Sequence, residues 1–250
     1  ALGWEISSRG PSRVHQAQAG ATQPGPLRSH LVEHTNLAEL NVGVLALQGD
    51  FAEHKAALLK LGVEAREVRL PEQIDGLDGL IIPGGESTTL SRLMSIYHLR
   101  EPVERMALEG HCIWGTCAGM IMMAQEITEG DPVPLRLMDI GVQRNSYGRQ
   151  VDSFEQDLDI SAVDPSSGAT RFNGVFIRAP GIIRAGHGVD VLAALPGGQP
   201  VAVRQGNLLA LSFHPELTSD LRFHDYFLGL AAARPAVLEL DIKEGTPVSE

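Results

Sequence analysis

Short apolar runs alternate along the chain with segments whose apolar residues recur at helical spacing. Each run ends in glycine, proline or polar residues, which is typical of a buried strand followed by a turn. The segment 78–89 is expected to begin with a strand. Further strands are expected at 112–114, 136–144, 174–178, 189–195, 200–205 and 207–213. Strands that alternate with helices predict a mostly parallel α/β sheet flanked by helices.

Two helices can be placed from local patterns. Asp50 is suited to cap the first helix, with Glu53 three residues later, which together form a capping box. The apolar face of this helix is expected to consist of Ala56, Leu58, Leu59 and Leu61. This interpretation gives Asp50, Glu53 and His54 structural roles, so we assign them none in catalysis. The last helix is expected at about 218–233, starting after Thr218 or Ser219.

Composition predicts one domain with polar ends. The chain has 250 residues and is 43% hydrophobic, enough to bury one large core, which we place at 41–233. Residues 1–40 are rich in Gly, Pro, Ser, Gln and Ala without sustained apolar spacing, so we expect a disordered N-terminal extension or a leader. A transit peptide is the alternative, which the acidic residues oppose. We expect a surface loop at 164–170 and a polar tail at 234–250.

Charge and cysteine content exclude several classes of protein. The net charge of −11 argues against a nucleic-acid partner, and no apolar run reaches membrane-spanning length. Cys112 and Cys117 are the two cysteines, and their spacing suggests neither a disulfide framework nor a zinc site. We therefore expect no metal, no cofactor and no membrane partner, and a reducing cytoplasmic setting.

The string G-T-C-A-G at 115–119 follows an apolar run and leads directly into the apolar segment 120–124. A strand that turns sharply into a helix at such a string predicts a nucleophile elbow, which presents the Cys117 side chain at the strand end. The positive potential of a helix N-terminus favours the thiolate, the species that attacks carbonyl carbon. A buried structural cysteine beside a tight turn is the alternative.

The string H-P-E at 214–216 follows another apolar strand. Proline restricts its own φ angle and biases the preceding residue toward extended geometry. Residues two apart in an extended segment share a face, so Glu216 can orient the imidazole of His214 while the other ring nitrogen faces Cys117. Together with the elbow, this predicts a Cys–His–Glu triad.

A third apolar strand ends in P-G-G-E-S-T at 83–88. Adjacent glycines allow backbone N–H groups to approach a ligand closely. The amide of Gly85 and that of Ala118, the residue after the nucleophile, are candidates for an oxyanion hole. The segment lacks a Walker lysine and the G-x-G-x-x-G spacing, which argues against a nucleotide loop.

These strings together resemble the class I glutamine amidotransferases. Further strings are similar to the glutaminase-subunit family of pyridoxal 5′-phosphate synthase, the PdxT type: L-Q-G-D at 47–50 with Glu53 and His54, R-N-S-Y-G-R-Q at 144–150 and F-I-R-A-P at 176–180. The resemblance covers about 41–233. It implies a three-layer, flavodoxin-like amidotransferase fold and the hydrolysis of L-glutamine to L-glutamate and ammonia.

The resemblance also implies residue roles. Cys117 corresponds to the nucleophile, His214 to the general base and acid, and Glu216 to the orienting carboxylate. Six residues are implied to hold glutamine: Gly85, Glu86, Ser87, Arg144, Ile177 and Arg178. Glutamine carries an α-carboxylate and an α-ammonium, so its pocket needs a cation and an acid or carbonyl groups. Surface ion pairing is the alternative role for the two arginines.

The implied partner is a (β/α)8 synthase subunit of the PdxS type, joined in a large hetero-oligomer, which receives the ammonia to build the vitamin B6 ring. Two alternatives remain open. The chain could serve an amidotransferase of another pathway, or it could be a binding module that keeps the fold without turnover.

Overall fold

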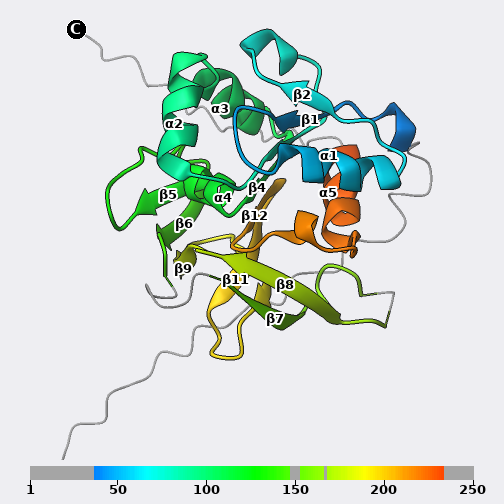
Figure 1. The fold of residues 1–250 in the computed structure, drawn as a ribbon, viewed down its shortest axis with the longest axis vertical. Coiled ribbons are helices and arrows are strands. Elements are labelled where there is room, and N and C mark those ends of the chain that lie inside the picture. The colour runs from blue at the N-terminus through cyan, green and yellow to red at the C-terminus, as the bar shows by residue number, and fades with distance from the viewer. Residues whose placement is uncertain (1–36, 147–152, 166–167, 234–250) are drawn as a thin grey trace, which may run out of the picture.

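The computed structural model describes residues 37–146, 153–165 and 168–233, which form a three-layer α/β domain (Figure 1). A seven-stranded sheet in the order β10-β11-β12-β4-β3-β1-β2 lies at its centre. Its strands are β1 (Val42–Leu45), β2 (Arg66–Val68), β3 (Gly79–Ile82), β4 (Cys112–Thr116), β10 (Asp190–Ala194), β11 (Pro200–Gln205) and β12 (Leu208–Leu211). The five strands from β12 to β2 are parallel, and β10 and β11 add antiparallel pairs at one edge.

The parallel strands are apolar on both faces because helices cover both. On β4, Trp114 faces one core cluster and Ile113 the other, and on β3 Ile81 and Ile82 divide in the same way. This alternation follows from the two-residue period of a strand. One face carries α1 (Phe51–Lys60) and α5 (Arg222–Ala232), and the other carries α2 (Ser87–Ile96), α3 (Arg100–Leu108) and α4 (Ala118–Met123).

Two smaller sheets adjoin this core. One has the order β5-β6-β9, and the other is the antiparallel pair β7-β8. Their strands are β5 (Ala124–Ile127), β6 (Met138–Gln143), β7 (Ser153–Asp159), β8 (Arg171–Ile177) and β9 (Gly181–Ala185). Single turns of 3-10 helix lie at Leu37–Glu39, Pro71–Gln73 and Pro215–Leu217. The turn at Pro215–Leu217, labelled η3 below, carries part of the candidate site.

The predicted fold class is confirmed, and the strands at 200–205 and 190–194 agree closely with expectation. Other boundaries were wrong. The last helix begins at Arg222 because η3 and a bend precede it. Strand β7 was not predicted, since its acidic residues mask an alternation in which Phe154 is half-buried and Leu158 fully buried.

The predicted apolar face of α1 was partly wrong. Leu58 is buried, but Leu59 is 64% exposed. The buried stripe of α1 consists of His54, Ala57 and Leu58, at the i, i+3 and i+4 spacing of one helix face. A histidine therefore takes a core position in this helix.

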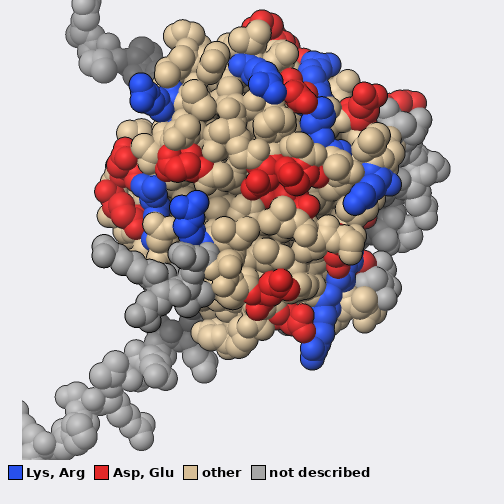
Figure 2. All heavy atoms as spheres, in the orientation of Figure 1, with Lys and Arg blue, Asp and Glu red and all other residues tan. Residues whose placement is uncertain are grey.

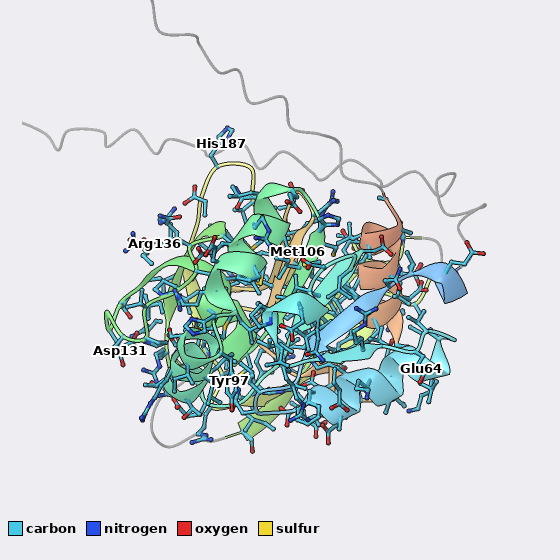
Figure 3. The ribbon with its side chains drawn as sticks, turned by 90° about the horizontal axis from the view of Figure 1, so that it is seen from above. Glu64, Tyr97, Met106, Asp131, Arg136 and His187 are labelled. Atoms are coloured by element: carbon cyan, nitrogen blue, oxygen red, sulfur yellow. The ribbon has the colours of Figure 1, made fainter. Side chains whose placement is uncertain are left out.

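The surface carries charges of both signs in small, separate groups on the face shown in Figure 2. Viewed from above, Glu64, Asp131 and His187 lie on connections at the rim of the molecule (Figure 3). None of the described helices is long and apolar enough to span a membrane. Residues 1–36 and 234–250, which include most of the expected extension and all of the expected tail, lie outside the described residues.

Candidate active site

Three predicted motifs meet at one edge of the sheet. Strand β4 lies between β3 and β12, and all three run parallel, so their carboxyl ends share an edge. Cys117 directly follows β4, the glycine pair 84–85 follows β3, and His214 follows β12. In open parallel sheets this edge is where ligands bind.

Cys117 has the strained backbone of a nucleophile elbow. Its φ of 48° and ψ of −103° are unusual for a residue with a side chain. Its N–H donates to the carbonyl of Leu211 at 2.8 Å, which fixes the turn to β12. The elbow prediction is consistent with this geometry. A Cβ on Gly119 would lie 1.9 Å from the carbonyl oxygen of Ile82, so Gly119 permits close packing of α4 against β3.

His214 and Glu216 lie side by side and are almost fully buried. Nδ1 of His214 is 2.7 Å from Oε1 of Glu216. The backbone N–H of His214 donates to the carbonyl of Val175 at 2.9 Å, so β8 also orients the histidine. Burial raises the pKa of Glu216, whereas its hydrogen bond with His214 opposes that rise. The two side chains pair as expected, but the backbone expectation was wrong, because Pro215–Leu217 forms a turn of 3-10 helix and not an extended segment.

Asp50 was wrongly predicted to cap α1. It occupies the N-cap position, but its side chain makes no capping hydrogen bond. Its Oδ2 instead lies 3.4 Å from Nδ1 of His214. Burial would lower the pKa of His214, but the neighbouring Asp50, Cys117 and Glu216 side chains outweigh it and raise the pKa to about 12. The histidine therefore rests as an imidazolium between the thiol and two carboxylates.

The same residues form the group best suited to a metal among the described side chains. Asp50, His214 and Glu216 each offer one ligand atom, all within 4.8 Å of one another. The group uses Nδ1 of His214, which already faces both carboxylates. Binding a cation there would require loss of the Nδ1 proton, because a metal ligand must present a lone pair.

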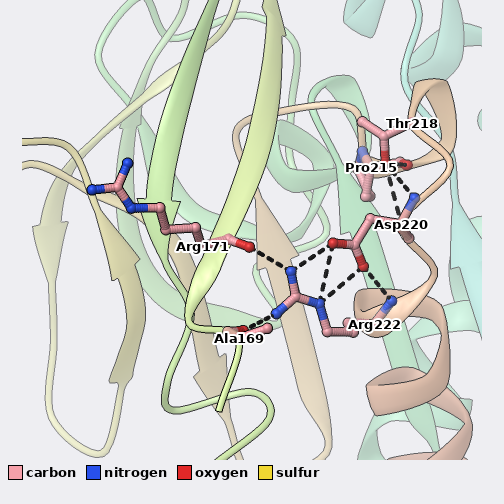
Figure 4. A network of polar contacts seen from close by, with 6 residues as sticks. All are labelled: Ala169, Arg171, Pro215, Thr218, Asp220 and Arg222. Atoms are coloured by element: carbon pink, nitrogen blue, oxygen red, sulfur yellow. Dashed lines mark hydrogen bonds and ion pairs between the residues drawn. The ribbon is translucent and has the colours of Figure 1, made fainter. Parts of the chain in front are cut away.

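A polar network holds the segment after Glu216 in place (Figure 4). The guanidinium of Arg222 donates to both carboxylate oxygens of Asp220 and to the carbonyls of Ala169 and Arg171. Thr218 donates to the carbonyl of Pro215 at 3.0 Å. These bonds tie η3 and the start of α5 to β8, the strand that also orients His214.

His54 is a polar residue of this region that the sequence analysis assigned to structure alone. It is fully buried on α1, and its Nε2 lies 3.4 Å from Oε2 of Glu216. The signal that points to it is a histidine within the buried stripe of an amphipathic helix. Its position next to Glu216 has no local signal, since the two residues are far apart in sequence.

The glycine pair 84–85 packs tightly between His214 and the segment that contains Gln48 and Asp50. A Cβ on Gly84 would lie 2.5 Å from Cε1 of His214, and one on Gly85 would lie 2.3 Å from Oε1 of Gln48. Gly85 also has a φ of 136°, a region that favours glycine. The N–H of Glu86 donates to the same Gln48 oxygen at 3.0 Å. The side chain of Gln48 therefore holds this loop in its present conformation.

Comparison with known families places the chain in one of them. The profile of the SNO glutamine amidotransferase family matches residues 44–232, a range that includes Cys117, His214 and Glu216. The chain belongs to the SNO glutamine amidotransferase family. The edge where the three motifs meet therefore lies within the part of the chain that matches a glutamine amidotransferase.

Named relatives and solved structures agree with this SNO-family assignment. The pyridoxal 5′-phosphate synthase subunit PdxT of Herpetosiphon aurantiacus is 55% identical over 194 residues, covering 76% of this chain and 100% of that one. The subunit of the same name from Thermus thermophilus is 55% identical over 192 residues, covering 76% and 97%. A crystal structure of a glutamine amidotransferase is 53% identical, covers 76% and 98%, and has a TM-score of 0.71. The PurLQS structure from Thermotoga maritima, at 16% identity and a TM-score of 0.61, covers 76% and 98% and shows likeness of fold alone.

Two of the residues expected to hold glutamine, Glu86 and Arg144, are neighbours in the folded domain. Glu86 lies at the N-cap of α2 and accepts hydrogen bonds from the N–H groups of Thr88 and Thr89. Burial alone would raise the pKa of Glu86, but bonds from these two threonines lower it to about 2. The guanidinium of Arg144 lies 3.5 Å from Glu86, so the cation and the acid are neighbours.

Three further expected residues are also placed. Ser87 is buried in the first turn of α2. The carbonyl of Ile177 lies 4.0 Å from Sγ of Cys117, which brings the end of β8 beside the thiol. Arg178 is exposed and has a positive φ of 43°. The remainder of the string that begins at Arg144 includes 147–150, which lie outside the described residues.

Gly84→Ala is expected to lower kcat for glutamine hydrolysis by about 100-fold. The new methyl group would lie too close to the His214 ring and would displace it by up to about 1 Å. Gly229→Ala is the matched control, since a Cβ at Gly229 in α5 meets no atom within 4 Å. Steady-state glutamate production by both variants checks this expectation. Wild-type turnover by Gly84→Ala would contradict the placement of the loop against His214.

His224 makes stability depend on pH. Burial lowers the pKa of this α5 residue to about 4, whereas an unfolded histidine titrates near 6.5. As the pH falls below about 6.5 the unfolded chain binds a proton first, so stability decreases until about pH 4. The expected loss from His224 is about 3 kcal/mol. Urea unfolding at pH 7 and pH 4 should show a smaller loss in His224→Gln, and an equal loss in both proteins would contradict the assignment.

Proposed function

We propose that this chain hydrolyses L-glutamine to L-glutamate and ammonia through Cys117, His214 and Glu216. One observation carries the proposal: His214 lies between an elbow cysteine and a buried carboxylate, to which its Nδ1 is held at 2.7 Å. Nε2 of His214 is buried and has no hydrogen-bond partner among the described residues, while Nδ1 is engaged by carboxylates. A buried donor without a partner is costly, and a substrate amide beside the thiol would supply one.

The reaction follows from this arrangement. In the proposed cycle Cys117 reacts as a thiolate and attacks the side-chain carbonyl carbon of glutamine. The N–H groups of Gly85 and Ala118 donate to the resulting oxyanion. Nε2 of His214 gives its proton to the departing nitrogen, the C–N bond breaks, and ammonia leaves. The neutral imidazole then takes a proton from water, which cleaves the glutamyl thioester and releases glutamate.

The pocket for the α-amino acid end of glutamine is formed by Glu86, Ser87, Arg144, Ile177 and Arg178 in this proposal. An arginine pairs with the α-carboxylate, and an acid or a carbonyl group accepts from the α-ammonium. The pairing of Arg144 with Glu86 supports this pocket, because it brings a cation and an acid together at the start of α2, which follows β3.

The proposed acceptor of the ammonia is a pyridoxal 5′-phosphate synthase subunit with a (β/α)8 fold, in a large hetero-oligomer. The names of the relatives, each 55% identical and nearly fully covered, support this partner. Ammonia released to neutral water would be protonated and lose its nucleophilic lone pair. Direct transfer to a bound partner therefore has a chemical reason.

The test is glutamate production by the purified chain with and without the synthase subunit. We expect turnover that appears or rises when the partner is present. Turnover indifferent to this partner would leave the glutaminase in place and favour another acceptor pathway. No glutamate in either condition would overturn the proposal and favour a binding module.

A further inference from the structure

His54 lies at the centre of a buried polar chain behind the candidate site. Its Nδ1 is 3.0 Å from Nε2 of His224, and its Nε2 is 3.2 Å from Oγ1 of Thr116. The same Nε2 lies 3.4 Å from Oε2 of Glu216. Trp114 covers the ring edge-on at a centroid distance of 5.3 Å. An imidazole in such a site needs partners for both nitrogens, and here each has one.

The positions of the protons on His54 and His224 can be assigned. Burial lowers the pKa of His54 and of His224, so each ring is neutral and carries one proton. Oε2 of Glu216 meets no donor in full hydrogen-bond geometry among the described residues, but Nε2 of His54 lies 3.4 Å from it, and a lone pair on that nitrogen would repel the carboxylate. The arrangement that avoids this repulsion puts the proton of His54 on Nε2 and that of His224 on Nε2. His224 then leaves only an acceptor, Nδ1, without a partner among the described residues.

We propose that His54 is a positioning residue for the triad, whose Nε2–H holds the second carboxylate oxygen of Glu216. The inference rests on the proposed function. A neutral donor stabilises the carboxylate without adding a positive charge that would compete with His214. Oε1 of Glu216 then stays on Nδ1 of His214, and Nε2 of His214 stays directed away from the carboxylate.

The packing of the elements supports this role. His54 lies one turn into α1, and α1 contacts η3, which carries Glu216. The same helix begins after Asp50, whose carboxylate faces Nδ1 of His214. Helix α1 therefore sets the distances from the triad to both Asp50 and His54.

The titratable groups that face Glu216, His54 and His224 follow from the same contacts. Glu216 is faced by His214, Asp50 and His54. His54 is also faced by His224 from α5, and the charge of Lys60 acts on His224. Among the described residues, the thiol of Cys117 also acts on His214.

The experiment compares His54→Leu with His54→Gln in the complex with the synthase subunit. Leucine removes the donor, and we expect kcat to fall about 10- to 100-fold while KM changes by less than about twofold. Without its donor Glu216 holds a proton to higher pH, so the acid limb of the kcat profile should move to higher pH. Glutamine retains an N–H near the position of Nε2 and should restore most of the activity.

Two outcomes would overturn the inference. One is a His54→Leu enzyme with wild-type kcat and an unmoved acid limb. If this variant fails to fold, ¹⁵N NMR of the wild-type chain decides instead, because the inference requires His54 protonated at Nε2 and is contradicted by protonation at Nδ1. A wild-type complex without turnover would mean failure of the proposed function itself, whereas an active wild type with an indifferent variant would mean failure of the role of His54 alone.

Discussion

Cys117→Ala is expected to abolish glutamate production, because alanine has no group that can form the thioester. Removing the nucleophile from a covalent triad leaves only binding and oxyanion stabilisation, and in comparable hydrolases this costs on the order of a million-fold in kcat. Activity should therefore fall below detection in an assay of glutamate release. The fold should persist, since Cys117 lies at a turn and the methyl group of alanine occupies part of its space.

Cys112→Ala provides the matched control. Cys112 lies five residues earlier, at the start of β4, and its Sγ faces the carbonyl of Phe227 at 4.0 Å. Burial raises the pKa of the Cys112 thiol well above its usual range, so it stays neutral and unreactive. This variant should keep its turnover. Loss of activity in Cys112→Ala together with turnover in Cys117→Ala would reverse the assignment of the nucleophile.

Glu216→Gln is expected to lower kcat by about 1000-fold or more. The amide removes the negative charge 2.7 Å from Nδ1 of His214, so the imidazolium loses support and its pKa falls. An amide N–H facing Nδ1 would also favour the wrong tautomer. The equivalent change of an orienting carboxylate in serine proteases costs about 10,000-fold. Asp50 remains 3.4 Å from Nδ1 and should limit the loss here.

Steady-state kcat and KM, measured together with the thermal midpoint, check this expectation. Glu64→Gln is the control, because Glu64 is an exposed acid at the rim of the molecule (Figure 3). Its turnover should equal that of the wild type. A Glu216→Gln enzyme within tenfold of wild-type kcat would show that Asp50, not Glu216, is the main partner of His214.

The parts of the site that could be predicted from sequence are those with a local cause. Cys117 follows from a strand, a sharp turn and a helix within ten residues. The pairing of His214 with Glu216 follows from their closeness in sequence, although Pro215–Leu217 forms a turn of 3-10 helix where an extended segment was expected. The fold class follows equally from apolar runs that alternate with helices. In each case neighbours along the chain determine the geometry.

Contacts between distant segments could not be predicted in this way. Asp50 matches a capping box locally, but its carboxylate turns to His214, a residue 164 positions away in the sequence that only the folded sheet brings near. His54 resembles one more member of an amphipathic helix until Glu216 packs beside it. Strand β7 depends on its pairing with β8, from Ser153 opposite Ile177 to Asp159 opposite Arg171, more than on its own composition.

The most direct test of the central claim is peptide mapping by mass spectrometry after treatment with a glutamine analogue that carries an electrophilic diazoketone in place of the amide. The complex with the synthase subunit is treated with and without excess glutamine. We predict that one adduct forms, on Cys117, and that glutamine prevents it. An adduct on Cys112, or an active enzyme that forms no adduct on Cys117, would contradict the account.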